Sequence, residues 1–176
     1  MKETGIVRRI DELGRVVIPK EIRKTMRIKE GDPLEIFTDR ETLMLKKYSP
    51  VTAIEDIIKT VAESLYSVTE MNVVISNTDS IVAVKGKQAK EFSDKSISPE
   101  LIRLIGERKT IVFDGSEESV SLTADGDRFK KQIIVPVICE GDALGAVILG
   151  DDREGAIDVG FIKLAMLSAD FIARQF

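Results

Sequence analysis

The first fifty residues carry more short strand signals than a unit of that size can bury. Four short runs of β-prone residues are predicted to be strands: 6–10, 16–18, 34–38 and 43–46. Between the second and third runs, one helix of about two turns is expected from about Lys20 to Arg27, with Pro19 at its first position. A unit so small, with so short a helix, cannot hold a stable core alone. We therefore expect this part to be an obligate dimer in which two copies intertwine.

Charge is divided unevenly along the chain. Residues 1–50 carry 12 Lys and Arg against 9 Asp and Glu, a net charge of +3, whereas the whole chain has a net charge of −4. The remaining residues therefore carry −7. Such an asymmetry suggests that the first part meets nucleic acid or another anionic surface.

The positive charges gather in about twenty residues. Four cations of the predicted helix share one stripe, at spacings i, i+3, i+4 and i+7: Lys20, Arg23, Lys24 and Arg27. The stripe alone is also compatible with the solvated face of a short helix. Arg8, Arg9 and Arg15 lie just before it, around a turn at residues 11–14 in which Gly14 can take a positive φ. Seven cations so close together favour a phosphate-binding surface.

A long ungapped pattern covers this region: residues 4–23, TGIVRRIDELGRVVIPKEIR, and residues 28–36, IKEGDPLEI. It closely resembles the AbrB-type transition-state regulators over about residues 1–50. The resemblance implies a swapped-hairpin β-barrel dimer that binds double-stranded DNA. Carried over by position, the DNA contacts are Arg8, Arg15, Arg23 and Lys24, with Arg9 and Lys20 as neighbouring basic candidates. Relatives often have Arg where this chain has Lys24, and Lys keeps the charge but not the bidentate fork.

Residues 51–176 are predicted to form a second domain. Thr52 with Glu55 forms a capping box that starts an amphipathic helix. Then follow, in order, strands at 72–76 and 81–84, a helix at 98–108 capped by Ser98, strands at 110–113 and 119–123, a hairpin of 133–139 with 143–149, and a helix at 157–174. This order indicates an antiparallel sheet with helices on its faces, so the chain as a whole is assigned to the α+β class.

The last predicted helix has two apolar stripes. One stripe contains residues 157, 161, 164, 168 and 172, and the other contains residues 162, 166, 169 and 173. Two apolar faces need two partners. We expect one face to pack on the domain's own sheet and the other on a helix of a second subunit.

The element order and the hairpin IIVPVICEGDALGAVILGDD resemble a GAF-type sensory domain, which implies a GAF-like α/β domain with an antiparallel sheet. The two parts together, 1–50 and 51–176, resemble late-sporulation transcriptional regulators of spore-forming bacteria. That resemblance implies a homotetramer, action as an activator, a repressor or both, and a small-molecule signal for the second domain. No ligand-binding residue is assigned for that signal. Within this domain, Pro136 suggests an edge or bulge, and Gly145 a bulge or close packing.

The residue types present argue against an enzyme, a metal site or a bound cofactor. The chain has no His and a single Cys, Cys139, so it lacks a recognisable nucleophile–base pair and a thiolate metal site. The loop carboxylates Asp151, Asp152 and Glu154 are interpreted as solvated. No apolar run has the length of a membrane span and no signal peptide is apparent, so a cytoplasmic protein without a membrane partner is expected.

Two other functions compete with DNA regulation. Small antitoxins share the swapped-hairpin fold, so an antitoxin-like protein-binding module is the alternative. Those proteins continue into a disordered toxin-binding tail, whereas residues 51–176 have the pattern of a packed domain. An enzyme carried by the second domain is the third hypothesis.

Overall fold

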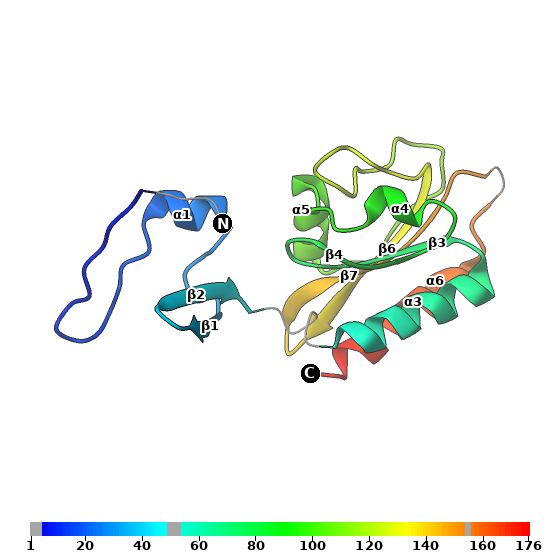
Figure 1. The fold of residues 1–176 in the computed structure, drawn as a ribbon. Coiled ribbons are helices and arrows are strands. Elements are labelled where there is room, and N and C mark those ends of the chain that lie inside the picture. Colours follow the sequence, from blue (N-terminus) through cyan, green and yellow to red (C-terminus); the bar gives the residue numbers. More distant parts are fainter. Residues whose placement is uncertain (1–4, 49–53, 154–155) are drawn as a thin grey trace. The chain divides into compact units, whose positions relative to one another are not determined.

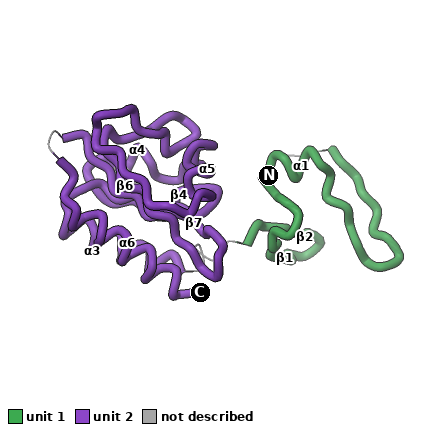
Figure 2. Tube along the Cα trace, turned by 180° about the vertical axis from the view of Figure 1, so that it is seen from behind, with its two compact units in different colours: residues 1–48 green, residues 49–176 purple. Residues whose placement is uncertain are grey.

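The computed structural model describes residues 5–48, 54–153 and 156–176 (Figure 1). The chain divides into two compact units, Met1–Tyr48 and Ser49–Phe176 (Figure 2). Each unit has its own secondary structure and is described separately.

The first unit contains one short helix and one hairpin. Helix α1 spans Lys20–Thr25, and strands β1 (Leu34–Asp39) and β2 (Thr42–Lys47) pair antiparallel with Leu34 opposite Lys47. Arg40 closes the hairpin with a φ of 49°. The strands predicted at 34–38 and 43–46 are confirmed.

The predicted strands at 6–10 and 16–18 do not form in this single chain, where both segments lack a β-ladder. Only the turn between them is closed: Gly14, with a φ of 77°, donates its N–H to the carbonyl of Asp11 at 2.9 Å. A two-stranded ribbon without a covering layer is at best marginal in water, so these β-prone arms need backbone partners from elsewhere.

Helix α1 ends earlier than predicted. Arg27 has a φ of 53°. The N–H of Ile28 donates to the carbonyl of Arg23 at 2.8 Å, and the N–H of Arg27 donates to the carbonyl of Lys24 at 3.3 Å. These bonds form a Schellman motif, which terminates a helix. Arg27 therefore does not extend the stripe of Lys20, Arg23 and Lys24, and Pro19 is the N-cap rather than the first helical residue.

The first unit has almost no core. Among its described residues only Pro19 is buried. Large apolar side chains are exposed all along it: Ile6, Val7, Ile10, Leu13, Val16, Val17, Met26, Ile36, Phe37, Leu43 and Met44. So much exposed apolar surface is unusual for a stable monomeric domain.

The second unit is a five-stranded antiparallel sheet with helices on both faces (Figure 1). Its strand order is β4-β3-β7-β6-β5, built from β3 (Asn72–Asn77), β4 (Ile81–Lys85), β5 (Ile111–Phe113), β6 (Lys131–Cys139) and β7 (Asp142–Asp151). Its helices are α3 (Glu55–Thr69), α4 (Ala89–Phe92), α5 (Pro99–Glu107) and α6 (Val159–Ala173). Helices α3 and α6 lie side by side on one face, and α4 and α5 lie on the other. The predicted α+β class and antiparallel sheet are confirmed.

Alternation along the central strands builds two cores. In β7, Val147 and Leu149 belong to the cluster under α3 and α6, whereas Ala146 and Ile148 belong to the cluster under α4 and α5. Successive side chains of a strand point to opposite faces, so a strand covered on both faces is apolar throughout. This is why the sequence of β7 is a nearly continuous apolar run.

The local signals of the second unit have mixed outcomes. Ser98 caps α5, accepting the N–H of Leu101 at 2.9 Å, as predicted. Thr52 lies outside the described residues, and Ile54 is the N-cap of α3. The predicted strand at 119–123 is wrong: it makes only a single bridge, from Thr123 to Ile97.

Pro136 and Gly145 behave as the sequence suggests. Strand β5 pairs with β6 only at residues 132–134, so Pro136 lies on a stretch of β6 that β5 leaves uncovered, next to a bulge at 137/138. A Cβ at Gly145 would lie 1.9 Å from the carbonyl oxygen of Ser76, which confirms close packing.

Helix α6 is apolar on two sides, but the sides differ from the predicted stripes. Ile172 from one stripe and Ala169 and Ala173 from the other are buried in the same cluster, because the small alanines let the helix approach the sheet. Four apolar side chains of α6 are exposed instead: Val159, Met166, Leu167 and Phe171. We call these four residues the outer face of α6.

Gly150→Ala should destabilise the second unit. A Cβ there would lie 1.9 Å from the ring of Phe129, which is fully buried and stacked on Phe92 with ring centroids 4.6 Å apart. We expect the free energy of unfolding to fall by about 1–3 kcal/mol, as for other overpacked cores. Urea unfolding followed by circular dichroism measures it.

Gly106→Ala is the matched control, because Gly106 is in α5 and its Cβ would meet no atom within 4 Å. There the same substitution should stabilise by about 0.4–1 kcal/mol. An unchanged stability of Gly150→Ala would mean that the Phe129 ring can move aside without cost.

Candidate nucleic-acid interface

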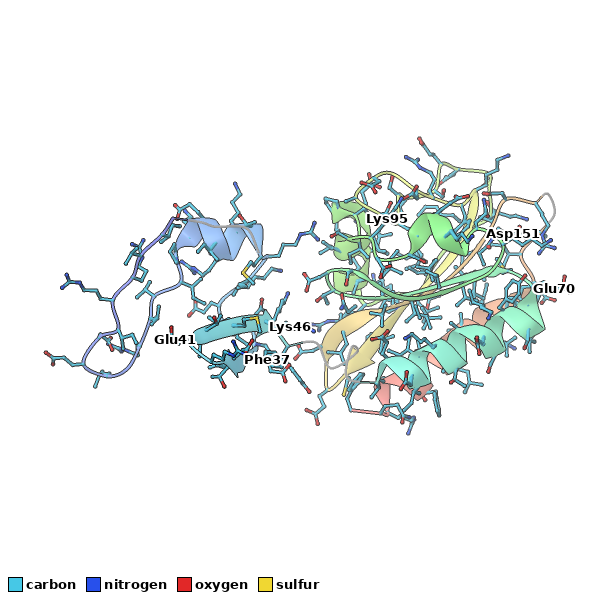
Figure 3. All side chains as sticks on the ribbon, viewed as in Figure 1. Phe37, Glu41, Lys46, Glu70, Lys95 and Asp151 are labelled. Atoms are coloured by element: carbon cyan, nitrogen blue, oxygen red, sulfur yellow. The ribbon has the colours of Figure 1, made fainter. Side chains whose placement is uncertain are left out.

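A tight three-residue loop presents the first group of cations. The N–H of Asp11 donates to the carbonyl of Arg15 at 3.1 Å, and residues 12–14 form the loop, with Gly14 in the left-handed region. A type I turn followed by a left-handed residue is a common three-residue hairpin loop. Arg8 and Arg9 lie on the arm before the loop, and Arg15 lies directly after it. Figure 3 shows the side chains of the described residues as sticks on the ribbon.

Asp11 organises this loop with its side chain. Its Oδ1 accepts the N–H groups of Leu13 at 3.0 Å and of Arg15 at 2.8 Å. Its Oδ2 accepts Nε–H of the Arg15 guanidinium at 2.8 Å. The backbone hydrogen bond from Arg15, followed by the side-chain bond from the same residue, holds the pKa of Asp11 below its ordinary value. The carboxylate is therefore ionised at neutral pH, and its hydrogen bonds hold both the backbone and the guanidinium of Arg15.

Helix α1 presents the second group. Lys20, Arg23 and Lys24 are all exposed, and Glu21 in the first turn suits the helix dipole. Arg23 and Lys24 lie in the last turn, where positive charge is also favourable. The six predicted contact residues thus come from two places in one unit, the arms with their loop and α1.

Most of these cations have no internal counter-charge. Arg15 pairs with Asp11, but within 5–48, 54–153 and 156–176 no carboxylate oxygen lies within 4 Å of the charged groups of the other five: Arg8, Arg9, Lys20, Arg23 and Lys24. Some cations of the second unit, among them Arg128, Arg153 and Arg174, do pair with a neighbouring carboxylate. The exposed unpaired cations of the first unit are available to an external anion.

The second unit has a polar cleft that the sequence did not indicate. It measures about 790 Å³ and is lined by Asp114, Gly115, Glu117, Glu118, Ser119, Arg128, Lys130, Lys131, Asp152 and Arg153. Arg128 is held there by Glu118 at 2.5 Å and by the carbonyl of Ser119 at 3.2 Å. The segments that line the cleft are distant in the sequence, so only the fold brings them together.

The carboxylates beside this cleft are not simply solvated, and the prediction for Asp151 and Asp152 is corrected accordingly. Asp151 pairs with Arg153 at 2.8 Å. Asp152 accepts the backbone N–H of Lys130 at 2.7 Å and the side-chain amide of Gln88 at 3.0 Å. These bonds tie the end of β7 to β6 and to the segment before α4, while Glu154 lies outside the described residues.

The single cysteine, the possible metal ligands and the helix lengths complete the description of the candidate groups. Cys139 is half-buried at the end of β6. Among the residues that the structure describes, no three His, Cys, Asp or Glu side chains gather as a metal site would require. In the same residues, no helix combines the length and apolar character needed to cross a membrane.

Comparison with known proteins assigns both parts of the chain. Residues 53–176 match the family model described as stage V sporulation protein T C-terminal, transcription factor. Residues 7–53 match the model of antidote-toxin recognition MazE, bacterial antitoxin.

Two curated relatives come from Bacillus subtilis (strain 168). The chain is 44% identical to stage V sporulation protein T over 179 residues, covering 99% of this chain and 98% of the relative. It is 64% identical over 50 residues to the transition state regulatory protein AbrB, covering 28% of this chain and 52% of AbrB. A solved structure of AbrB's N-terminal part is titled a DNA recognition domain, with a TM-score of 0.25 over 28% of this chain and 94% of that one.

The second unit has the fold of GAF domains. The GAF-B domain of DevS from Mycobacterium smegmatis aligns with a TM-score of 0.53 at 12% identity, covering 68% of this chain and 89% of that chain. At that identity the likeness concerns the fold alone. Since one family model covers most of the chain and a 44% identical relative covers nearly all of it, the chain belongs to the stage V sporulation protein T family of transcription factors.

Proposed function

We propose that this protein regulates transcription by binding double-stranded DNA through the cations of its first unit. Arg8, Arg15, Arg23 and Lys24 make the main contacts, with Arg9 and Lys20 beside them. The observation that carries the proposal is this set of six exposed cations, of which all but Arg15 lack an internal counter-charge, in a unit 64% identical to the corresponding part of AbrB. The name of the family, a sporulation protein and transcription factor, supports a role at late sporulation genes in the cytoplasm, as an activator, a repressor or both.

The chemistry of the surface favours a binding mode led by phosphates. Lys and Arg that neutralise phosphates release counterions and supply most of the affinity for DNA. Selectivity then depends on DNA shape and deformability as well as on base edges. An Arg can contact two acceptors at once, whereas Lys24 acts as a point charge.

The first unit acts as a dimer in this proposal. Most of its large apolar side chains are exposed and the others are only half-buried, and its two β-prone arms lack a ladder. A second copy supplies both the missing strands and the missing core, in the swapped-hairpin arrangement. This covers the apolar surface while the cations stay outside.

The second units join such dimers into a homotetramer. The outer face of α6 is apolar and exposed, with Leu167 65% and Phe171 46% accessible. Val68 of the neighbouring α3 is also exposed. Packing of these helices against those of another copy buries this surface and links two DNA-binding dimers. The polar cleft between residues 114–119 and 128–131 is the place we assign to a small-molecule signal.

The antitoxin-like alternative has one observation in its favour, the match of residues 7–53 to the MazE model. The second unit weighs against it. Residues 54–176 build two cores around a sheet, where an antitoxin of this kind would have a disordered tail. Membership of a transcription-factor family also weighs against an enzyme.

The salt dependence of DNA binding tests the interface. For Arg8→Ala/Arg23→Ala, the slope of log K against log salt on a duplex should become shallower by about 0.9 for each phosphate that the variant no longer neutralises. Fluorescence anisotropy with the full-length protein measures it. The matched control is Arg103→Ala/Lys109→Ala, which removes two exposed cations from the second unit. Equal slopes for the two variants would contradict the assignment.

Leu167→Glu should reduce the assembly from a tetramer to a dimer. A charge on the outer face of α6 would be buried without a partner in the tetramer, so light scattering should give a dimer where the wild type gives a tetramer. Arg103→Glu introduces the same side chain on α5, on the opposite face of the sheet, and should leave the mass unchanged. A tetrameric Leu167→Glu variant would exclude this face as the contact.

A chain truncated after Tyr48 should remain a dimer and bind DNA more weakly. Two linked dimers gain avidity, which can reach about 10²–10⁴ without any additional interaction. Titration of a duplex long enough for two dimers compares the two proteins. Equal affinities would show that the second unit does not join the DNA-binding units.

A further inference from the structure

We propose that Asp11 is a positioning residue for DNA recognition, which aims Arg15 and makes it selective. The proposal rests on the proposed DNA-binding function and adds a residue that carries the wrong charge for phosphate. Asp11 lies between Arg9 and Arg15, at the start of the loop, and is itself exposed. A carboxylate in a surface that binds DNA weakens binding by repulsion, so its presence there needs a reason.

The geometry supplies one. Three hydrogen bonds join Asp11 to Arg15. Oδ1 of Asp11 accepts the backbone N–H of Arg15 at 2.8 Å, and the backbone N–H of Asp11 donates to the carbonyl of Arg15 at 3.1 Å. Oδ2 of Asp11 accepts Nε–H of the Arg15 side chain at 2.8 Å. A free Arg side chain loses much rotamer entropy when it binds. Here the hydrogen bond to Asp11 restricts the rotamers of the Arg15 side chain before DNA binds.

The hydrogen bond also selects which edge of the guanidinium faces outward. Only Nε–H is engaged by Asp11, so the other four of the five N–H donors stay available. They belong to the two terminal nitrogens, which form the end-on fork that matches a phosphate or the O6 and N7 acceptors of guanine. Arg15 is therefore presented as an oriented fork rather than as a mobile charge.

Asp11 and Glu12 should then have separable effects. Both are exposed carboxylates of one loop, but the Arg15 guanidinium pairs with Asp11 and not with Glu12. Removing either charge reduces the repulsion from DNA. Removing that of Asp11 also releases the guanidinium.

The experiment compares Asp11→Asn with Glu12→Gln in the full-length protein. Asn keeps an oxygen for the backbone N–H groups of Leu13 and Arg15, but its amide cannot accept Nε–H of Arg15 while serving them. Affinity is measured for a duplex selected in vitro from a random pool by the wild type, and for a scrambled duplex of the same composition. The ratio of the two affinities reports selectivity.

Both variants should bind the scrambled duplex more tightly than the wild type. Asp11→Asn should lower the ratio by about tenfold, the scale of one good bidentate contact, and Glu12→Gln should leave it unchanged. In an Arg15→Ala background, Asp11→Asn should have no further effect on the ratio. Equal ratios for the two variants would overturn the proposal, and so would a further fall in the ratio when Asp11→Asn is added to Arg15→Ala.

A second readout distinguishes this effect from misfolding. The Nε–H proton of Arg15 should exchange slowly in the free wild type and in Glu12→Gln, and rapidly in Asp11→Asn, as seen by NMR at neutral pH. Slow exchange in Asp11→Asn would also overturn the proposal. If the wild type bound no duplex at low salt, both the proposed function and this inference would be wrong. If the wild type bound DNA and Asp11→Asn kept its selectivity, only this inference would be wrong.

Discussion

The exposed apolar surface of the first unit is the constraint on which the rest depends. This segment carries a series of β-prone and aliphatic side chains that one copy cannot cover, and in the single chain only Pro19 is buried among the described residues of that unit. The favourable free energy of burying such surface is of the order of 25 cal/mol per Å², so it dominates other local terms. This surface is the reason why we propose that the unit associates with a second copy, which would give its β-prone arms the strand partners that they lack in the single chain.

The proposed association would also explain how so many cations can be concentrated in one small unit. Like charges in one small unit repel, and this repulsion opposes a compact monomer. The proposed dimer would bring even more positive charge together, so its shared core would have to offset the repulsion until an anion neutralises it. The stability of such a dimer and its affinity for phosphate would then be linked, since any anion that binds a folded state stabilises it.

The sequence predicted what depends on local pattern and missed what depends on distant contacts. The loop with Gly14, the cap at Ser98, the edge position of Pro136 and the antiparallel sheet all follow from signals within a few residues, and the structure has them. The strands at 6–10 and 16–18 carry an equally clear local signal, yet a strand exists only with a partner and one chain supplies none. The early end of α1 was missed because Arg27 takes a left-handed conformation that nothing in its side chain indicates.

The carboxylates of the chain show the same division. Asp152 has the sequence pattern of a solvated carboxylate, because its partners Gln88 and Lys130 are 64 and 22 residues away. Asp11 could have been found from the sequence, since an Asp four residues before an Arg across a Gly-containing turn is a local pattern, but its charge made it look irrelevant to a basic surface. A negative residue in such a surface is informative because repulsion from phosphate acts against it. Where it pairs with the cation that should reach DNA, the pairing costs some affinity and supplies direction, and a regulator that must choose among many similar sites depends on direction more than on affinity.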